Sequence, residues 1–167
     1  MQEGVSLMPY NTFGIDVSAA TFAEFHSIQA LIDLLPTIRS TETIISGGGS
    51  NMLFTKNFDG FFAKNCLTGI KEIERTDESI ILEAGAGEVW HDFVLYCVDH
   101  GYGGLENLSL IPGCVGASPM QNIGAYGTEI KDTFEYLDAL EISSGTMKRF
   151  YLNDCAFGYR EVSLKGS

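Results

Sequence analysis

A long segment with no charge and little room for regular structure constrains this chain most. The run Ile111–Gly127, IPGCVGASPMQNIGAYG, contains four glycines and two prolines, and none of its side chains is charged. Glycine and proline both disfavour a continuous helix or strand, and proline lowers the entropy lost when a loop is ordered. The segment therefore predicts either a ligand-binding loop or a compact loop that packs on itself.

The residues of this run suit a flat, mostly apolar ligand. Glycine backbone can approach a ring closely because glycine has no Cβ. Apolar and hydrogen-bonding side chains are interspersed along the run, namely Ile111, Ser118, Met120, Gln121, Asn122, Ile123 and Tyr126. Cofactor sites are commonly built as apolar pockets with a few polar groups, and an uncharged lining leaves the electronics of a cofactor to hydrogen bonds.

A second glycine cluster, Gly47–Gly49 in ISGGGSN, lies between two apolar runs that we expect to be strands. Consecutive N–H groups in such a cluster can turn one way and bind a pyrophosphate, and Ser50 and Asn51 add side-chain donors. The motif is not a Walker A loop, because no Gly-Lys-Ser/Thr follows, and its spacing differs from the dinucleotide fingerprint. A glycine-rich hairpin turn is an equally good interpretation of this segment alone.

The charge of the chain excludes several classes of partner. Its 167 residues include 10 Lys and Arg against 22 Asp and Glu, a formal net charge of −12 at pH 7. A field of that sign repels nucleic acid and acidic membrane surfaces. Hydrophobic residues make up 45% of the chain, so we expect a folded core. No apolar run reaches membrane-spanning length and no signal pattern opens the sequence, which favours a soluble, cytoplasmic protein.

The cysteines and histidines show no metal-binding spacing. No C-x-x-C pair is present, and the residues concerned are spread along the chain: Cys66, Cys97, Cys114, Cys155, His26, His91 and His100. We therefore expect no metal site, and reduced thiols that pack as small hydrophobic side chains. His91 and Asp92 are neighbours on an expected helix and cannot face each other, so we expect a solvated face there rather than a catalytic pair.

Hydrophobic periodicity predicts an α+β fold. Helices are expected over residues 28–38 and 89–100, the second with an apolar stripe of Val89, Trp90, Phe93, Val94, Cys97 and Val98. Strands are expected over residues 20–27, 42–46, 52–54 and 60–66, in a hairpin around 77–79, and on both sides of 143–145. This uneven alternation favours antiparallel sheet over a doubly wound parallel sheet.

Five motifs, in a fixed order, carry a resemblance that covers nearly the whole chain. They are NTFGID, GGGSNMLF, GAGEVWHDFV, GLENLSLIPGCVGASPMQNIGAYGTEI and FGYRE, which begin at Asn11, Gly47, Gly85, Gly104 and Phe157. With these motifs the chain resembles the UDP-N-acetylenolpyruvoylglucosamine reductases, also called UDP-N-acetylmuramate dehydrogenases, which are flavoenzymes of bacterial cell-wall synthesis. The run that begins at Gly104 is very specific, whereas GGGSN alone is shared with other flavin domains.

The resemblance implies a two-lobe FAD-binding domain of the vanillyl-alcohol-oxidase and p-cresol methylhydroxylase type, in which two α+β lobes clamp FAD. The first lobe would cover residues 1–65, and an incomplete second lobe would cover residues 66–167. By the same resemblance, the pyrophosphate would be held by Gly47, Gly48, Gly49, Ser50 and Asn51. The flavin would be lined by Ile111, Pro112, Gly113, Gly116, Ser118, Gly124, Ala125 and Tyr126.

The resemblance also implies a reaction. NADPH reduces the flavin, which then passes hydride to the enolpyruvyl group of UDP-N-acetylglucosamine enolpyruvate. Arg160 matches the catalytic arginine of the family. A guanidinium can grip a carboxylate with two parallel N–H bonds, and it favours the enolate over the ground state because charge accumulates there. The structural alternative for Arg160 is an ion pair with a surface carboxylate.

The end of the chain departs from the family pattern. Family members continue well past Ser167 into a substrate-binding domain that holds the proton-donating serine and an assisting glutamate. We therefore expect this chain to lack both groups and to be inactive by itself. Val162 and Leu164 stand where the family has serine and phenylalanine, and Gly166–Ser167 could be an expression scar. An expressed fragment and a truncated gene product are both consistent with this ending.

The shortened pattern has consequences for binding and assembly. FAD binding is expected to survive in weakened form, and a sheet edge without its next strand invites self-association. Two other interpretations stay open from the sequence. One is a different flavin oxidoreductase of the same fold, and the other is an FAD-binding module without chemistry of its own.

Overall fold

The structure, a computed structural model, describes residues 1–164 and divides the chain into two compact units, Met1–Leu67 and Thr68–Ser167. The interpretation of Gly166–Ser167 as a scar falls outside the described residues. Within the described part, no helix combines the length and the apolar character needed to cross a membrane. In residues 1–164 each unit mixes strands with one α-helix, which confirms the predicted α+β class.

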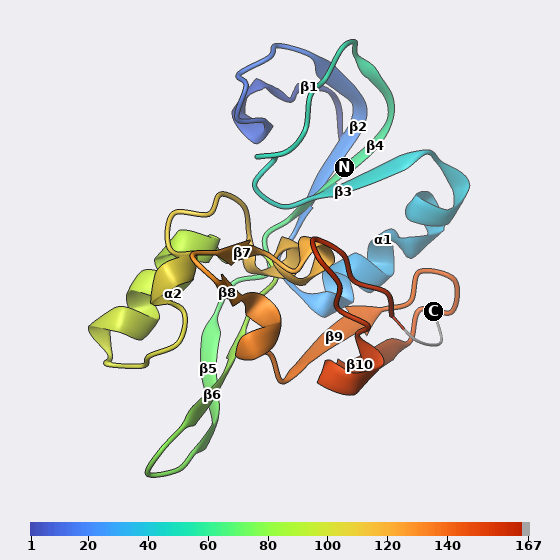
Figure 1. The fold of residues 1–167 in the computed structure, drawn as a ribbon. Helices are drawn as coiled ribbons and strands as arrows, with labels where there is room; N and C mark the ends of the chain where they lie inside the picture. Colours follow the sequence, from blue (N-terminus) through green and yellow to red (C-terminus); the bar gives the residue numbers. More distant parts are fainter. Residues whose placement is uncertain (165–167) are drawn as a thin grey trace. The chain divides into compact units, whose positions relative to one another are not determined.

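The first unit is built on a four-stranded sheet of order β1-β2-β4-β3 (Figure 1). Its elements are β1 (Gln2–Ser6), β2 (Ser18–Phe25), helix α1 (Ile28–Ser40), β3 (Thr43–Ser46) and β4 (Phe58–Asn65), with a 3-10 turn at Met8–Tyr10. Strands β1 and β2 are antiparallel, but β4 runs parallel to both β2 and β3. The expectation of antiparallel sheet was therefore wrong here, because α1 returns the chain so that β3 runs in the same direction as β2.

Helix α1 follows its sequence signals closely. Ser27 caps it by accepting a hydrogen bond from the Ala30 N–H at 3.1 Å. Leu31 and Leu35 are its buried residues, whereas Ile28, expected on the same apolar face, is 38% exposed. Pro36 lies inside the helix, which continues beyond the predicted end to Ser40.

Aromatic side chains dominate the core of the first unit. The rings of Phe22 and Phe62 stack with their centroids 6.0 Å apart. The expected strand over residues 52–54 is absent, because the segment between β3 and β4 has no regular structure. Met52 and Phe54 nevertheless pack against this core, while Leu53 between them is 67% exposed. Side-chain burial alone thus accounts for the apolar pattern that predicted a strand there.

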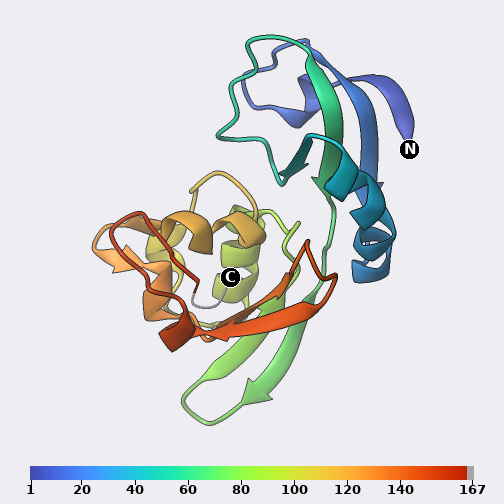
Figure 2. The same ribbon diagram turned by 90° about the vertical axis from the view of Figure 1, so that its right-hand side faces the viewer.

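The second unit places small sheets around helix α2 (Trp90–Asp99), as Figure 2 shows from a second side. Its strands are β5 (Ile70–Arg75), β6 (Ile80–Ala84), β7 (Gly124–Ala125), β8 (Thr128–Glu129), β9 (Tyr136–Leu140) and β10 (Met147–Tyr151). They form the antiparallel pairs β5–β6, β7–β8 and β9–β10. Both predicted hairpins, around 77–79 and 143–145, are therefore confirmed.

The core of the second unit forms on one face of α2. Its buried members are Trp90, Phe93, Val94, Cys97, Leu108 and Ile130. Two residues expected on the apolar stripe lie elsewhere: Val89 is the N-cap and is 49% exposed, and Val98 is 46% exposed. Gly101, at φ 74°, follows the end of the helix where the sequence predicted its stop.

The cysteines are reduced, as expected, but they are not packed alike. Cys97, Cys114 and Cys155 are buried, and burial raises the pKa of the Cys97 thiol to about 11. Cys66 is only partly buried, so the expectation that every thiol packs as a small hydrophobic side chain was wrong for it. Its position at the end of β4 leaves it on an accessible part of the first unit.

Candidate functional site

The first glycine segment, Gly47–Asn51, leaves the sheet directly after β3. Gly49 has φ 66°, and a Cβ built on it would lie 2.0 Å from the backbone oxygen of Tyr10. Any side chain at this position would therefore force the segment away from the backbone beneath it. Gly49 is required because the segment rests directly on the turn that contains Tyr10.

The side chain of Asn11 fixes the turn that contains Tyr10. It is 6% exposed, and its Nδ2 donates to the carbonyl oxygens of Leu7 at 2.8 Å and Ile15 at 3.0 Å. Its Oδ1 accepts from the Ile15 N–H at 2.9 Å. Thr12 N–H then donates to the Gly49 carbonyl at 3.2 Å, which ties the turn to the glycine segment. The motif NTFGID therefore serves as the support of GGGSN.

The donors of this glycine segment have no acceptor among the residues that the structure describes. Among residues 1–164, no hydrogen bond is donated by the backbone N–H groups of Gly47 to Asn51, nor made by the side chains of Ser50 and Asn51. Lys64 donates its ammonium to the Gly47 carbonyl and so brings a cation to the segment. Most of this loop is exposed or partly buried, so water or a bound anion can accept from these N–H groups.

The hairpin interpretation of this glycine segment was wrong. A hairpin needs antiparallel strands on both sides of the turn. Here the strand before the segment, β3, pairs in parallel with β4, and residues 51–57 form no strand. The segment is therefore a loop at the carboxyl end of a parallel strand, which is the edge of a sheet where ligands commonly bind.

The second glycine segment, Ile111–Gly127, is held by hydrogen bonds to residues 86–90. Val115 N–H donates to the Glu88 carbonyl, and Gly116 N–H to the Ala86 carbonyl, each at 2.9 Å. A Cβ on Gly116 would lie 2.6 Å from the Ala86 Cβ, so glycine permits this close approach. The motif GAGEVW thus pairs with the loop that was singled out first in the sequence.

Several residues expected to line a flavin also serve the packing of this loop. Ser118 is 3% exposed, and its Oγ donates to the Val115 carbonyl at 2.7 Å. Ile111, Val115 and Ile123 pack against the core around α2. In contrast, Met120 is 67% exposed and Tyr126 is 90% exposed. The compact-loop interpretation therefore describes the middle of the segment, while its exposed side chains are available for contacts.

Asn122 joins this loop to the segment that carries Arg160. It is 2% exposed and has a left-handed backbone, with φ 41°. Its Nδ2 donates to the Gly158 carbonyl at 3.0 Å, and its Oδ1 accepts from the Lys131 N–H at 3.3 Å. The sequence identified Asn122 only as a hydrogen-bonding residue, whereas the structure shows that it connects three parts of the second unit.

An open hollow of about 340 Å³ lies beside Asn122 in the second unit. It is lined by Asn122, Gly124, Ala125, Tyr126, Gly127, Thr128, Glu129, Tyr159 and Arg160. The structure thus brings the predicted residues Gly124, Ala125 and Tyr126 together with Arg160. It does not bring Ile111, Pro112, Gly113, Gly116 or Ser118 to this hollow. The lining residues Thr128, Glu129 and Tyr159 were missed, although they lie in or beside the quoted motifs.

The composition of the loop suggested an uncharged lining, but the hollow carries charged side chains. Arg160 and Glu129 both line it. The Lys131 ammonium pairs with the Glu129 carboxylate and holds the pKa of that carboxyl below its usual range. The loop contributes no charge of its own, and the residues that follow it supply both signs.

Arg160 has an exposed guanidinium that no carboxylate neutralises within the described residues. Its Nη2 donates to Gln121 Oε1 at 3.1 Å, and its backbone has φ 54°. The surface ion pair, which was the structural alternative, is therefore not formed in this part of the chain. The guanidinium keeps donors available for an anionic group.

We expected no catalytic pair between His91 and Asp92, and the hydrogen-bonding contacts of His91 are with other residues. Its Nδ1 lies 3.1 Å from Ser109 Oγ and accepts from the Leu110 N–H at 3.3 Å. His91 is partly buried and Asp92 is exposed, so the face that carries them is partly solvated. Its observed contacts are with the turn before the second glycine segment, where Leu110 has φ 61°.

Comparison with known proteins gives these segments a context. UDP-N-acetylenolpyruvoylglucosamine reductases from Flavobacterium johnsoniae and Bacteroides fragilis are 48% and 45% identical to the chain, each over 99% of it. The same enzyme from Pseudomonas putida is 48% identical over 98% of the chain. The chain spans about half the length of these curated relatives, 49–50%. These relatives confirm the resemblance that the motifs predicted.

The fold has a solved counterpart. The crystal structure of UDP-N-acetylenolpyruvylglucosamine reductase (MurB) from Thermus caldophilus matches with a TM-score of 0.76 and 22% identity, over 97% of this chain and 56% of that one. A family model described as an FAD binding domain matches residues 19–151, which include both glycine segments. The chain therefore belongs to the FAD-binding domain family.

Proposed function

We propose that this chain is the FAD-binding part of a UDP-N-acetylenolpyruvoylglucosamine reductase, an NADPH-dependent enzyme of peptidoglycan synthesis. Family membership and the names of the relatives support this assignment. The observation that carries it at the level of the site is the array of unused N–H donors over Gly47–Asn51. Consecutive backbone N–H groups without protein acceptors are the kind of site that binds a phosphate group.

The residues of the first unit fit the diphosphate of FAD. Backbone N–H groups of Gly47–Asn51, the side chains of Ser50 and Asn51, and the nearby ammonium of Lys64 would hold it. Bound FAD would supply hydride after its reduction by NADPH. In a chain of net charge −12, the N–H groups supply oriented dipoles for the anion and Lys64 supplies a positive charge beside them.

The second unit is proposed to line the flavin in a two-lobe domain of the vanillyl-alcohol-oxidase type. The exposed ring of Tyr126 offers an apolar surface for it, beside the backbone of Gly124 and Ala125. Lining of the flavin is also proposed for Ile111, Pro112, Gly113, Gly116 and Ser118, several of which fix the loop internally as well.

Arg160 is proposed to act on the substrate UDP-N-acetylglucosamine enolpyruvate. Its guanidinium would grip the enolpyruvyl carboxylate and stabilise the enolate, in which negative charge accumulates. The hydrogen bond to Gln121 limits the orientations available to the guanidinium. Proton donation to the enolate is assigned to no residue of this chain, so we propose that residues 1–167 alone give no turnover.

Flavin binding tests the proposal directly. Purified protein is titrated with FAD, and bound flavin is followed by the quenching of its fluorescence and the shift of its absorption bands. Saturable binding at one equivalent is expected, with riboflavin bound much more weakly because it lacks the diphosphate. Equal affinity for riboflavin and FAD would contradict the role of Gly47–Asn51, and failure to bind either would overturn the assignment.

Arg160→Lys tests the proposed role of Arg160 toward the substrate. The variant is made in a longer form of the protein that has reductase activity. Lysine keeps the charge but loses the bidentate grip. We expect kcat to fall by about a hundredfold or more, with FAD content unchanged. An unchanged kcat would remove Arg160 from the catalytic role.

The substrate class separates this proposal from its alternatives. A different flavin oxidoreductase of the same fold would be reduced by NADPH but would not be reoxidised by the enolpyruvyl nucleotide sugar. An FAD-binding module without catalytic activity would bind flavin but would show neither reaction, even in a longer form of the protein.

Self-association through an unpaired sheet edge also stays a proposal, and light scattering over a range of protein concentrations checks it.

A further inference from the structure

A cluster of three side chains at the end of the parallel strands has no part in the proposed function. The ladder between β2 and β4 pairs Phe25 with Asn65, and the Cys66 N–H donates to the Phe25 carbonyl at 3.0 Å. This register brings Cys66 next to His26, the residue that follows β2. Side chains two residues apart on a strand share a face, so Glu24 lies on the same side as His26.

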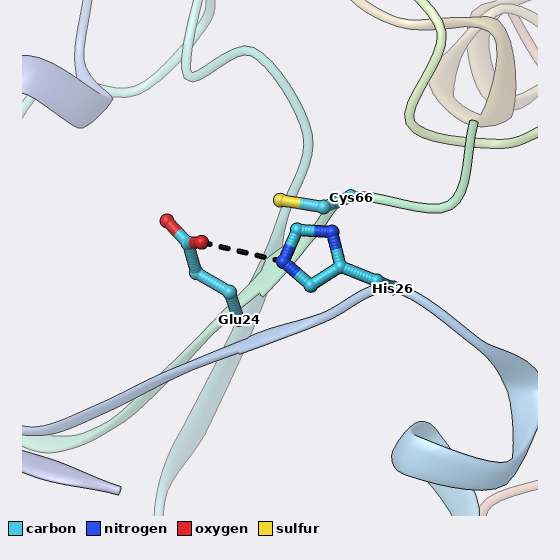
Figure 3. Close-up of side chains that lie close together, drawn as sticks. All are labelled: Glu24, His26 and Cys66. Atoms are coloured by element: carbon cyan, nitrogen blue, oxygen red, sulfur yellow. Dashed lines mark ion pairs between the residues drawn. The ribbon is translucent and has the colours of Figure 1, made fainter.

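The three side chains converge in space. One potential ligand atom from each of Glu24, His26 and Cys66 lies within 4.8 Å of the others. Figure 3 shows the cysteine sulfur and the glutamate carboxylate beside the imidazole, with the carboxylate joined to one ring nitrogen by an ion pair. Nε2 of His26 is 3.5 Å from Oε2 of Glu24. Ligand atoms of a tetrahedral zinc ion stand about 3.3–3.8 Å apart, so the cluster needs only a small rotation of accessible side chains to close around such an ion.

The surroundings orient the carboxylate toward the cluster. The Tyr10 hydroxyl donates to Oε1 of Glu24 at 3.2 Å, which leaves Oε2 on the side of His26. Lys64 is paired with Glu24 across the sheet but donates its ammonium to the Gly47 carbonyl. It forms no ion pair with Glu24 in the described part of the chain. A polar partner that orients a ligating carboxylate is a regular feature of metal sites.

We propose that Glu24, His26 and Cys66 form a binding site for a divalent transition-metal ion of the zinc type. Thiolate, imidazole and carboxylate together suit Zn²⁺ or Co²⁺, whereas Mg²⁺ and Ca²⁺ prefer oxygen ligands alone. Three protein ligands leave a fourth position for water or a small anion. Metal binding at this site releases the thiol proton of Cys66 to the solvent, because the thiolate is the ligand.

Cobalt spectroscopy tests the proposal with the whole chain. Metal-free protein is titrated with Co²⁺, and a thiolate-to-cobalt charge-transfer band in the near ultraviolet is expected, together with visible bands of a four-coordinate ion. Zn²⁺ should displace Co²⁺ and remove both signals. Cys66→Ser is expected to abolish the charge-transfer band. No band in the wild-type protein, or a band that persists in Cys66→Ser, would overturn the proposal.

Variants of the other two ligands test whether they act together. His26→Gln and Glu24→Gln are each expected to weaken Zn²⁺ binding by about tenfold or more, because even the outer partners of metal ligands are typically worth that much. His100→Gln and Glu42→Gln are matched controls on exposed residues outside the cluster and should bind Zn²⁺ as the wild type does. Equal affinity in all four variants would contradict the site.

Alkylation of Cys66 gives a readout that does not depend on any variant. Iodoacetamide modifies accessible thiols, and Cys66 is the only one of the four cysteines that is not buried. Zn²⁺ should slow its modification, measured by peptide mass spectrometry, while Mg²⁺ at the same concentration should not. Unchanged alkylation in the presence of saturating Zn²⁺ would show that the ion does not reach Cys66.

Discussion

The two glycine-containing segments use their backbones in opposite ways. In Gly47–Asn51 the N–H groups donate no hydrogen bond within the described residues. In Ile111–Gly127 many N–H groups donate hydrogen bonds within the second unit, to acceptors such as the Glu88 and Ala86 carbonyls. The first segment leaves its donors without protein acceptors among residues 1–164, and the second builds a fixed surface on which the Tyr126 side chain is exposed. Glycine content alone does not distinguish these roles, because both need close approach of backbone.

Hydrogen exchange should show this difference most strongly. Amides of Gly48 and Asn51 are expected to exchange about a thousandfold faster, relative to their intrinsic rates, than those of Val115 and Gly116, which need opening of the second unit. FAD should slow exchange in the first segment and leave the Val115 and Gly116 rates nearly unchanged. Equal protection of the two segments before FAD is added would break the comparison.

Gly49→Ala should weaken FAD binding by about a hundredfold. The new Cβ would meet the Tyr10 carbonyl at 2.0 Å and push the donor segment off its support. Gly4→Ala is the matched control, because Gly4 has a similar φ of 61° but open space around its Cβ position. Both variants place alanine at a positive φ, which costs about 1–2 kcal/mol of backbone strain. Only the clash with the Tyr10 carbonyl should therefore make their FAD affinities differ. Equal affinities in a flavin titration would contradict the support role of Tyr10.

Asn122→Ala should destabilise the protein by about 2–3 kcal/mol. It leaves the Gly158 carbonyl and the Lys131 N–H without their partner and places alanine at φ 41°. Asn122→Gly removes the same hydrogen bonds without the backbone strain, so its loss should be smaller by about 1 kcal/mol. Urea unfolding measures both values. A loss below about 0.5 kcal/mol for the alanine variant would show that the loop does not depend on Asn122.

Gly116→Ala should have the smallest effect of this series, a loss of about 1–2 kcal/mol in the free energy of unfolding. Its Cβ would crowd the Ala86 Cβ at 2.6 Å. Gly103→Ala is the control, since its Cβ would meet only the flexible Glu106 side chain, at 3.2 Å. Stability is read from thermal or urea unfolding. If Gly116→Ala lowered FAD affinity without any loss of stability, the glycine would face the ligand rather than the packing.

Local pattern predicted the regular elements well. The spacing of Leu31 and Leu35 marked α1, and polar turns between alternating strands marked both hairpins. The pattern failed at Met52 and Phe54, whose burial needs no strand, and at the parallel pairing of β4. These errors share one cause, because periodicity reports which side chains are buried and not which strand lies alongside.

The site was predictable only as far as motifs extend. Gly124, Ala125, Tyr126 and Arg160 were expected from the sequence and meet at one hollow. Thr128, Glu129 and Tyr159 line the same hollow but carried no separate signal. Asn122 was visible only as a polar residue, since its partners, Gly158 and Lys131, lie 36 and 9 residues away.

The sequence by itself determined the α+β class, the two hairpins and both helices, because these depend on patterns within short windows. It also carried the motifs that relate the chain to its family. Tertiary structure alone decided which backbone donors remain available at Gly47–Asn51 and that Glu24 and His26 meet Cys66. Strand register and hydrogen-bond pairing join residues far apart in the chain, and no local pattern specifies which of the possible partners will meet.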